Sequence, residues 1–62
     1  GPLKKLAPLF SLIIKPNSFL ILSGLLNEQI PYIINHYNNF GFIKKKVFYL
    51  NGWGSIILKR NP

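Results

Sequence analysis

The chain has 62 residues, no cysteine and a net charge of +7, with eight lysine and arginine residues against one acid. A core of this size rarely supplies more than about 3–5 kcal/mol without disulfides, metals or a partner. Disulfides are excluded, and no residues have the spacing of metal ligands. Yet 48% of the residues are hydrophobic, too many for a disordered tail. We therefore expect apolar surface that packs against more protein.

The excess of basic residues has two interpretations. It could mark a surface for nucleic acid or for an anionic membrane. The sequence is also rich in Ile, Lys, Asn, Phe and Tyr, which AT-rich codons encode. Such a codon bias raises the lysine content of the whole chain without any selection for a basic surface patch. We favour codon bias and expect no specific nucleic-acid binding. No apolar stretch approaches the roughly 18 residues of a membrane-spanning helix, and a signal-peptide cleavage site is missing, so we expect no membrane association.

The first half of the chain predicts a helix followed by a buried strand. Apolar residues recur at helical spacing over residues 3–14, with Pro8 either in the first turn or at a kink. The expected stripe is Leu3, Leu6, Ala7, Phe10, Ile13 and Ile14. Residues 19–22 form a continuous apolar run, typical of a strand covered on both faces in a parallel sheet. Ser23 and Gly24 are predicted to end this strand.

The second half predicts a helix and a hairpin. Asn27 is expected to cap a helix over residues 27–40, which Gly41 ends, although Pro31 fits its early turns imperfectly. Its expected stripe is Ile30, Ile33, Ile34 and Tyr37. Asn51 and Gly52 are a favoured type I′ pair that joins two strands. His36 lies off the apolar stripe and has no acidic, Cys or His partner, so we expect it to be solvated.

This order of helix, strand, helix, strand, hairpin and strand predicts an α/β fold. The first helix must cross over from an earlier parallel strand to reach residues 19–22, and we expect that strand to precede Gly1. Right-handed crossover makes the strands near residues 19–22 and Val47 parallel. The hairpin then returns the last strand in the antiparallel direction.

Several short motifs occur in the order and spacing of a known family. They are the opening segment Gly1-Pro2-Leu3-Lys4-Lys5-Leu6-Ala7-Pro8, the turn Ile14-Lys15-Pro16-Asn17-Ser18, the strand exit Leu22-Ser23-Gly24-Leu25-Leu26, Gln29, the helix exit Tyr37 with Gly41-Phe42, and Trp53. Together they resemble the ribosomal protein L-eleven methyltransferase (PrmA-type) family of class I S-adenosylmethionine-dependent methyltransferases, over essentially the whole chain. Two positions depart from the family pattern: Asn17-Ser18 replaces a glycine pair, and Gly54 replaces an apolar residue, which is expected to weaken the last strand.

The resemblance implies a fold and a function for a larger parent enzyme. Residues 1–62 would be the C-terminal fragment of one Rossmann-like methyltransferase domain, with the last strand antiparallel and inserted between the other two. The parent would transfer methyl groups from S-adenosylmethionine to lysine or N-terminal amines of a large-subunit ribosomal protein, in the cytoplasm. The family's Gly-rich cofactor loop and ribose-binding acid are missing from this chain. We therefore expect no catalytic, cofactor-binding or metal-binding residue here, and an inactive fragment when it is isolated from the rest of the domain.

Ser23, Gly24 and Trp53 are the candidate functional residues. Ligands of open α/β sheets bind beyond the carboxyl ends of the parallel strands. The inserted last strand would bring Trp53 to the same sheet end as Ser23 and Gly24. We expect these three residues to border the acceptor channel, although Ser23 and Gly24 fit a simple strand exit equally well.

Two other functions stay open at this point. A free-standing basic module that binds ribosomal RNA or another polyanion would use Lys44, Lys45 and Lys46, with nearby aromatic residues for stacking. We favour these lysines as protection of an exposed sheet edge against strand pairing. The second alternative is a sister methyltransferase that acts on a different acceptor.

Overall fold

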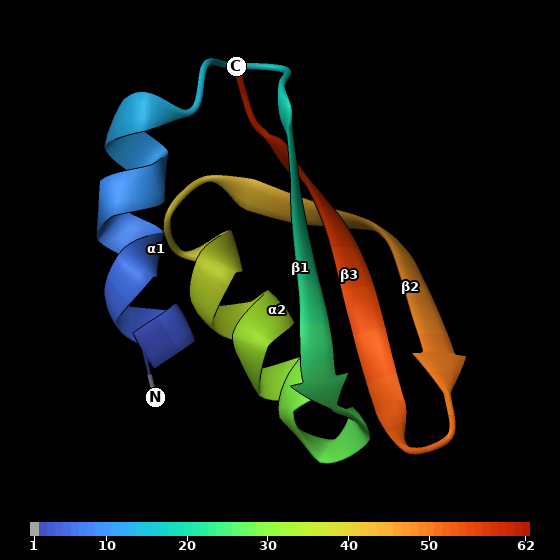
Figure 1. Cartoon of the computed structure of the whole chain (residues 1–62). Coiled ribbons are helices and arrows are strands. Elements are labelled where there is room, and N and C mark those ends of the chain that lie inside the picture. Colours follow the sequence, from blue (N-terminus) through green and yellow to red (C-terminus); the bar gives the residue numbers. More distant parts are fainter. Residues whose placement is uncertain (1) are drawn as a thin grey trace.

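The computed structural model describes residues 2–62, and two helices pack on one side of a three-stranded sheet (Figure 1). The elements are α1 (Pro2–Ile13), β1 (Phe19–Leu26), the 3₁₀ turn η1 (Asn27–Gln29), α2 (Ile30–Asn38), β2 (Phe42–Leu50) and β3 (Trp53–Arg60). The predicted element order and α/β class are confirmed. Among residues 2–62, neither helix is long and apolar enough to cross a membrane.

The last strand lies in the middle of the sheet, as predicted. The order is β1-β3-β2, and β3 pairs antiparallel with both neighbours, so β1 and β2 are parallel to each other. Asn51 and Gly52 have φ values of 51° and 82°, the left-handed pair that a type I′ turn requires. The carboxyl ends of β1 and β2 both flank Trp53, which pairs with Leu26 and Leu50.

Only one face of the sheet is covered within residues 2–62. Leu22, Ile56 and Leu58 are buried beneath the helices, whereas Phe19 and Ile21 are 59% and 64% exposed. Successive side chains of a strand point to opposite faces. Within residues 2–62, the predicted cover of residues 19–22 is therefore present on one face only. The uncovered side, which we term the open sheet face, carries Phe19, Ile21, Phe48, Trp53 and Ile57.

β1 continues past Ser23 and Gly24, so the prediction that these residues end the strand is wrong. Leu22 pairs with Ile56, but Leu25 pairs with Gly54, and two residues of β1 therefore face one residue of β3. This arrangement is a β-bulge. Gly24 has a φ of +70°, a conformation that glycine adopts without steric cost.

α2 begins later than predicted. Asn27 starts η1 instead of capping an α-helix, and the α-helix begins at Ile30. The structure explains Pro31, which occupies the first turn of α2, where its missing N–H breaks no helical hydrogen bond. α2 stops at Asn38, two residues before the predicted end, and Gly41 closes the following turn with a φ of +85°.

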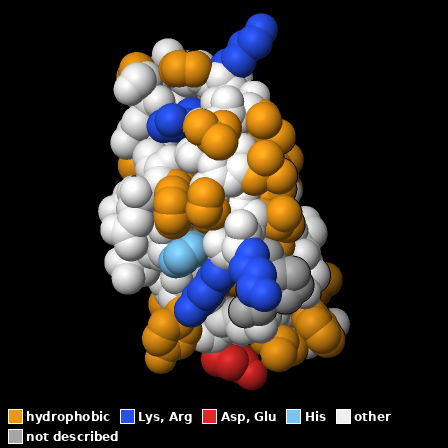
Figure 2. Space-filling view, turned by 90° about the vertical axis from the view of Figure 1, so that its left-hand side faces the viewer, with side chains coloured by type: hydrophobic (Ala, Val, Ile, Leu, Met, Phe, Trp, Pro, Cys, Tyr) orange, Lys and Arg blue, Asp and Glu red, His pale blue; other side chains and the backbone are white. Residues whose placement is uncertain are grey.

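The buried stripe of α1 is narrower than predicted. Ala7 is fully buried, and Leu3, Phe10 and Ile14 pack against the core. Leu6 and Ile13 are 36% and 62% exposed, so their expected burial is wrong. Figure 2 shows the side of the molecule that α1 occupies in Figure 1, where many hydrophobic side chains reach the surface.

Pro8 lies inside α1, and His36 compensates for the hydrogen bond that Pro8 cannot make. Proline has no N–H, so the carbonyl oxygen of Lys4, four residues earlier, loses its helical donor. The Nε2 atom of His36 lies 2.9 Å from that oxygen. Because a carbonyl can only accept, His36 donates this hydrogen bond. His36 is half-buried, so the prediction that it is solvated is wrong.

Replacing His36 tests this compensation. His36→Phe keeps a ring against Tyr37 and Phe40 but removes the donor, and we expect it to lower the free energy of unfolding by about 1–2 kcal/mol. Pro8→Ala restores a backbone N–H for the Lys4 carbonyl, so His36→Phe should cost much less in that background. Urea denaturation of both single variants and the double variant measures the coupling. A coupling energy near zero would contradict the compensation.

Tyr37 forms the centre of the core and a second bond between the helices. It is fully buried, and its hydroxyl donates to the carbonyl oxygen of Leu3 at 2.6 Å. Its ring centroid lies 5.8 Å from that of Phe42 and 6.5 Å from that of Phe10. Burial raises the pKa of the Tyr37 phenol above its ordinary value of 10.0, so the hydroxyl keeps its proton. Tyr37 and His36 together hold the first turns of α1 against α2.

Gly54 does not interrupt the last strand, because β3 runs continuously from Trp53 to Arg60. A Cβ atom at position 54 would overlap Cδ1 of Ile30 and lie 2.8 Å from the carbonyl oxygen of Phe48. Ile30 is 1% exposed and fills the space above the glycine. The apolar side chain that β3 lacks is thus supplied by α2.

Candidate functional site

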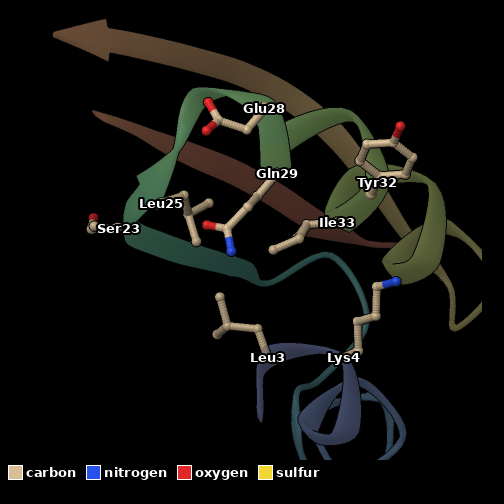
Figure 3. Close-up of a pocket in the computed structure, with 9 residues that line it drawn as sticks. Leu3, Lys4, Ser23, Leu25, Glu28, Gln29, Tyr32 and Ile33 are labelled. Atoms are coloured by element: carbon tan, nitrogen blue, oxygen red, sulfur yellow. The ribbon is translucent and has the colours of Figure 1, made fainter. Parts of the chain in front are cut away.

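A pocket of about 590 Å³ opens where α1, the bulge of β1, η1 and α2 meet (Figure 3). Leu3, Leu25 and Ile33 give it apolar walls. The bulge contributes two of the candidate residues, Ser23 and Gly24, to its lining. The pocket lies beside the carboxyl-terminal part of β1, the region of an α/β sheet where ligands bind.

The two bulge residues contribute to this pocket in different ways. The hydroxyl of Ser23 accepts a hydrogen bond from the Ser55 hydroxyl at 3.1 Å, so it is already paired across the sheet. A Cβ atom on Gly24 would have no heavy atom within 4 Å, so the space beside the glycine is open. We infer that the bulge shapes the rim of the pocket and leaves it accessible.

Trp53 lines a different hollow. This second pocket, of about 420 Å³, lies along the hairpin and includes Gly24, Phe48, Trp53 and Ser55. Trp53 is 54% exposed and pairs with Leu26, so it lies at the same sheet end as Ser23 and Gly24. The structure therefore brings all three predicted residues to one end of the sheet. It does not place them in one pocket, and Gly24 alone lines both.

The first pocket also contains polar residues that the sequence analysis did not assign to a site: Lys4, Glu28, Gln29 and Tyr32. The sequence contains a signal for two of these residues. Glu28 is the single acid of the chain, and Gln29 belongs to the series of family motifs. Their proximity to Ser23 could not be read from the sequence, since it depends on the bulge and on η1.

Gln29 has a fixed orientation in this pocket. Its Oε1 atom accepts a hydrogen bond from the Leu26 N–H at 2.9 Å, which caps η1. The amide nitrogen, with two hydrogens to donate, is left on the opposite side of the group. Figure 3 shows this nitrogen pointing toward Leu3, into the pocket.

The three lysines of β2 lie at an edge of the sheet, as predicted. Lys44, Lys45 and Lys46 are exposed, and β2 pairs only with β3 among the described strands. The register shifts between Lys44 and Lys46, so a bulge coincides with the charges. Nζ of Lys46 lies 5.1 Å from the ring centroid of Phe48. Charges and a bulge on an edge strand both discourage pairing with another sheet.

Comparison with known proteins shows that the chain is similar to methyltransferases. The family model described as "Ribosomal protein L11 methyltransferase (PrmA)" matches residues 1–61. The chain belongs to this family.

Curated relatives carry the same name and are much longer. The chain is 55% identical over 42 residues to the "Ribosomal protein L11 methyltransferase" of Hydrogenovibrio crunogenus, a match that covers 68% of this chain and 14% of that protein. It is 34% identical over 60 residues to the Bradyrhizobium diazoefficiens protein of that name, which covers 97% of this chain and 20% of the relative. The Vibrio campbellii protein is 44% identical over 39 residues, 63% of this chain and 13% of the relative. No solved structure matches the chain.

Proposed function

We propose that this chain forms the C-terminal part of a Rossmann-like, S-adenosylmethionine-dependent protein methyltransferase domain. The parent enzyme transfers methyl groups to amino groups, of lysine or of the N-terminus, in a large-subunit ribosomal protein in the cytoplasm. The observation that carries this proposal is the family match across residues 1–61. The names of the relatives support ribosomal protein L11 as the acceptor protein.

Two features of the fold support a place within a larger domain. Among the described strands β1 pairs only with β3, so its outer edge has free backbone groups that a further parallel strand could pair. The open sheet face also carries large apolar side chains that stay largely exposed within residues 2–62, such as Ile21 at 64% exposed. In this proposal, the remainder of the domain covers both the edge and the face.

The residues of this chain do not fit the cofactor. A methyltransferase cofactor site needs a glycine-rich turn between a strand and a helix, and an acid for the ribose hydroxyls. The described glycines with positive φ lie in the bulge of β1, after α2 and in the hairpin, so none of them lies in a glycine-rich turn that leads from a strand into a helix. Glu28, the single acid, lines the first pocket, which lies beside the β-bulge of β1 and which we term the bulge pocket. We therefore assign S-adenosylmethionine to the rest of the parent domain and expect the isolated chain neither to bind it nor to transfer methyl groups.

Ser23, Gly24 and Trp53 border the acceptor channel in this proposal. The support is their location at one sheet end, with Gly24 between the two pockets. The paired hydroxyl of Ser23 and the half-exposed ring of Trp53 act as walls and not as reacting groups.

A chimera tests the proposed function. The stretch of the Bradyrhizobium diazoefficiens relative that matches this chain is replaced by residues 1–62, and labelled methyl transfer to ribosomal protein L11 is measured. We expect the chimera to transfer methyl groups, and the isolated chain and the relative lacking that stretch to be inactive. A folded chimera without activity would overturn the proposal. Tight, selective binding of ribosomal RNA by the chain at physiological salt would instead support the basic-module alternative.

A further inference from the structure

The bulge pocket combines apolar walls with a single negative charge. Leu25 and Ile33 are 2% and 5% exposed, so these walls are held in place by the core. The carboxylate of Glu28 is the only acidic side chain of a chain with net charge +7. Within residues 2–62 it forms no ion pair, and its side chain is exposed. The pocket thus contains the one acidic side chain of the chain, and its carboxylate is available to a cation.

The neighbours of Glu28 suit a long aliphatic cation within a peptide. Tyr32 is 69% exposed and presents an aromatic ring beside the pocket, against which the methylene groups of a lysine can pack (Figure 3). The oriented amide of Gln29 supplies a donor for a peptide carbonyl oxygen. Lys4 lines the same pocket and repels a cation from its side, so the charges favour one direction of binding.

We propose that this pocket binds a lysine-containing segment of the methyl acceptor, with Glu28 holding the lysine ammonium and Gln29 donating to a backbone carbonyl. This inference rests on the proposed function and adds the docking residues. The bound lysine is not the amine that reacts. A carboxylate beside an ammonium stabilises the protonated form, and a protonated amine has no lone pair for attack. Glu28 is therefore a docking residue that positions the acceptor.

Binding of a fluorescent lysine-containing peptide from ribosomal protein L11 tests the inference, by anisotropy, with both the full chain and the chimera. An exposed ion pair contributes about 0.2–1 kcal/mol, so Glu28→Gln should raise Kd by a factor of about 1.4 to 5. The difference should disappear at high salt, where the screening length falls to about 3 Å at 1 M. Acetylation of the peptide lysines should remove the difference as well.

Two further variants separate docking from net charge and from folding. The swap Glu28→Gln with Gln29→Glu keeps the net charge and keeps an oxygen for the Leu26 N–H, but it moves the carboxylate and removes the amide donor. We expect the swap to weaken binding at least as much as Glu28→Gln. Lys4→Gln, on the same pocket, should leave Kd unchanged or lower it.

The outcomes distinguish this inference from the proposed function. In the chimera, Glu28→Gln should raise KM for the acceptor and leave kcat and the KM for S-adenosylmethionine unchanged. An active chimera whose peptide Kd is the same with and without Glu28 would overturn the inference alone. A folded chimera that binds the peptide through Glu28 but transfers no methyl group would overturn the proposed function alone. Failure of both the chain and the chimera to bind the peptide would also overturn the inference.

Discussion

Gly54→Val is expected to remove a large part of the free energy of unfolding of the chain, about 1–3 kcal/mol. The new Cβ atom would overlap Cδ1 of Ile30 and lie 2.8 Å from the carbonyl oxygen of Phe48. The Ile30 side chain is buried, and the Phe48 carbonyl belongs to the backbone of β2, which pairs with β3, so moving either neighbour disturbs the core or the sheet. Overpacking costs typically about 1–3 kcal/mol, and a core of this size supplies only about 3–5 kcal/mol.

Urea denaturation, followed by the fluorescence of Trp53 and by circular dichroism, measures this effect. Gly24→Asn is the matched control. Position 24 has a φ of +70° with open space around it, and asparagine tolerates the left-handed conformation. We expect the control to change the unfolding midpoint little. If Gly54→Val unfolds at the same urea concentration as the unchanged chain, then Ile30 does not pack on the glycine as described.

Ile21→Lys is expected to have opposite effects on the isolated chain and on the chimera. Ile21 is 64% exposed on the open sheet face, so a lysine there reduces the apolar surface that the isolated chain exposes to water. We expect this change to increase the monomeric fraction of the chain. In the chimera the same position should be covered by the rest of the domain. An unpaired buried charge then costs several kcal/mol, and we expect methyl transfer to fall by more than about tenfold.

Analytical ultracentrifugation of the chain and the methyl-transfer assay of the chimera give the two readouts. Ile21→Val keeps an apolar side chain of nearly the same shape and should change neither result. Full activity of the chimera with Ile21→Lys would show that the open sheet face stays exposed in the larger domain. That result would remove one of the two structural supports for the proposed placement.

Predictions from the sequence succeeded where local chemistry determines the backbone. Asn51 and Gly52 form the predicted hairpin because few residues other than Asn, Asp and Gly tolerate two successive positive φ angles. Gly41 ends α2 for a related reason. The inserted position of β3 came from the family resemblance together with the crossover rule.

Predictions failed where partners distant in sequence decide the structure. Gly24 is typical of a strand exit, but pairing with β3 continues the strand through a bulge. His36 has no partner in the sequence around it, because its acceptor is a backbone oxygen 32 residues away that Pro8 leaves unpaired. For the same reason, the proximity of Glu28 and Gln29 to Ser23 and Gly24 could not be predicted, because it depends on the bulge and on η1.

The two hydrogen bonds between the helices have a consequence for the shape of the bulge pocket. His36 and Tyr37, adjacent on α2, hold the carbonyl groups of Lys4 and Leu3, and the side chains of Lys4 and Leu3 line the pocket. Both bonds end on backbone oxygens, so the identities of residues 3 and 4 can vary without loss of either bond. His36 and Tyr37 therefore fix the spacing between the walls of the pocket. The side chains at positions 3 and 4 determine part of the surface that a ligand contacts. Selectivity can change in evolution through positions 3 and 4 while the aperture of the pocket is conserved.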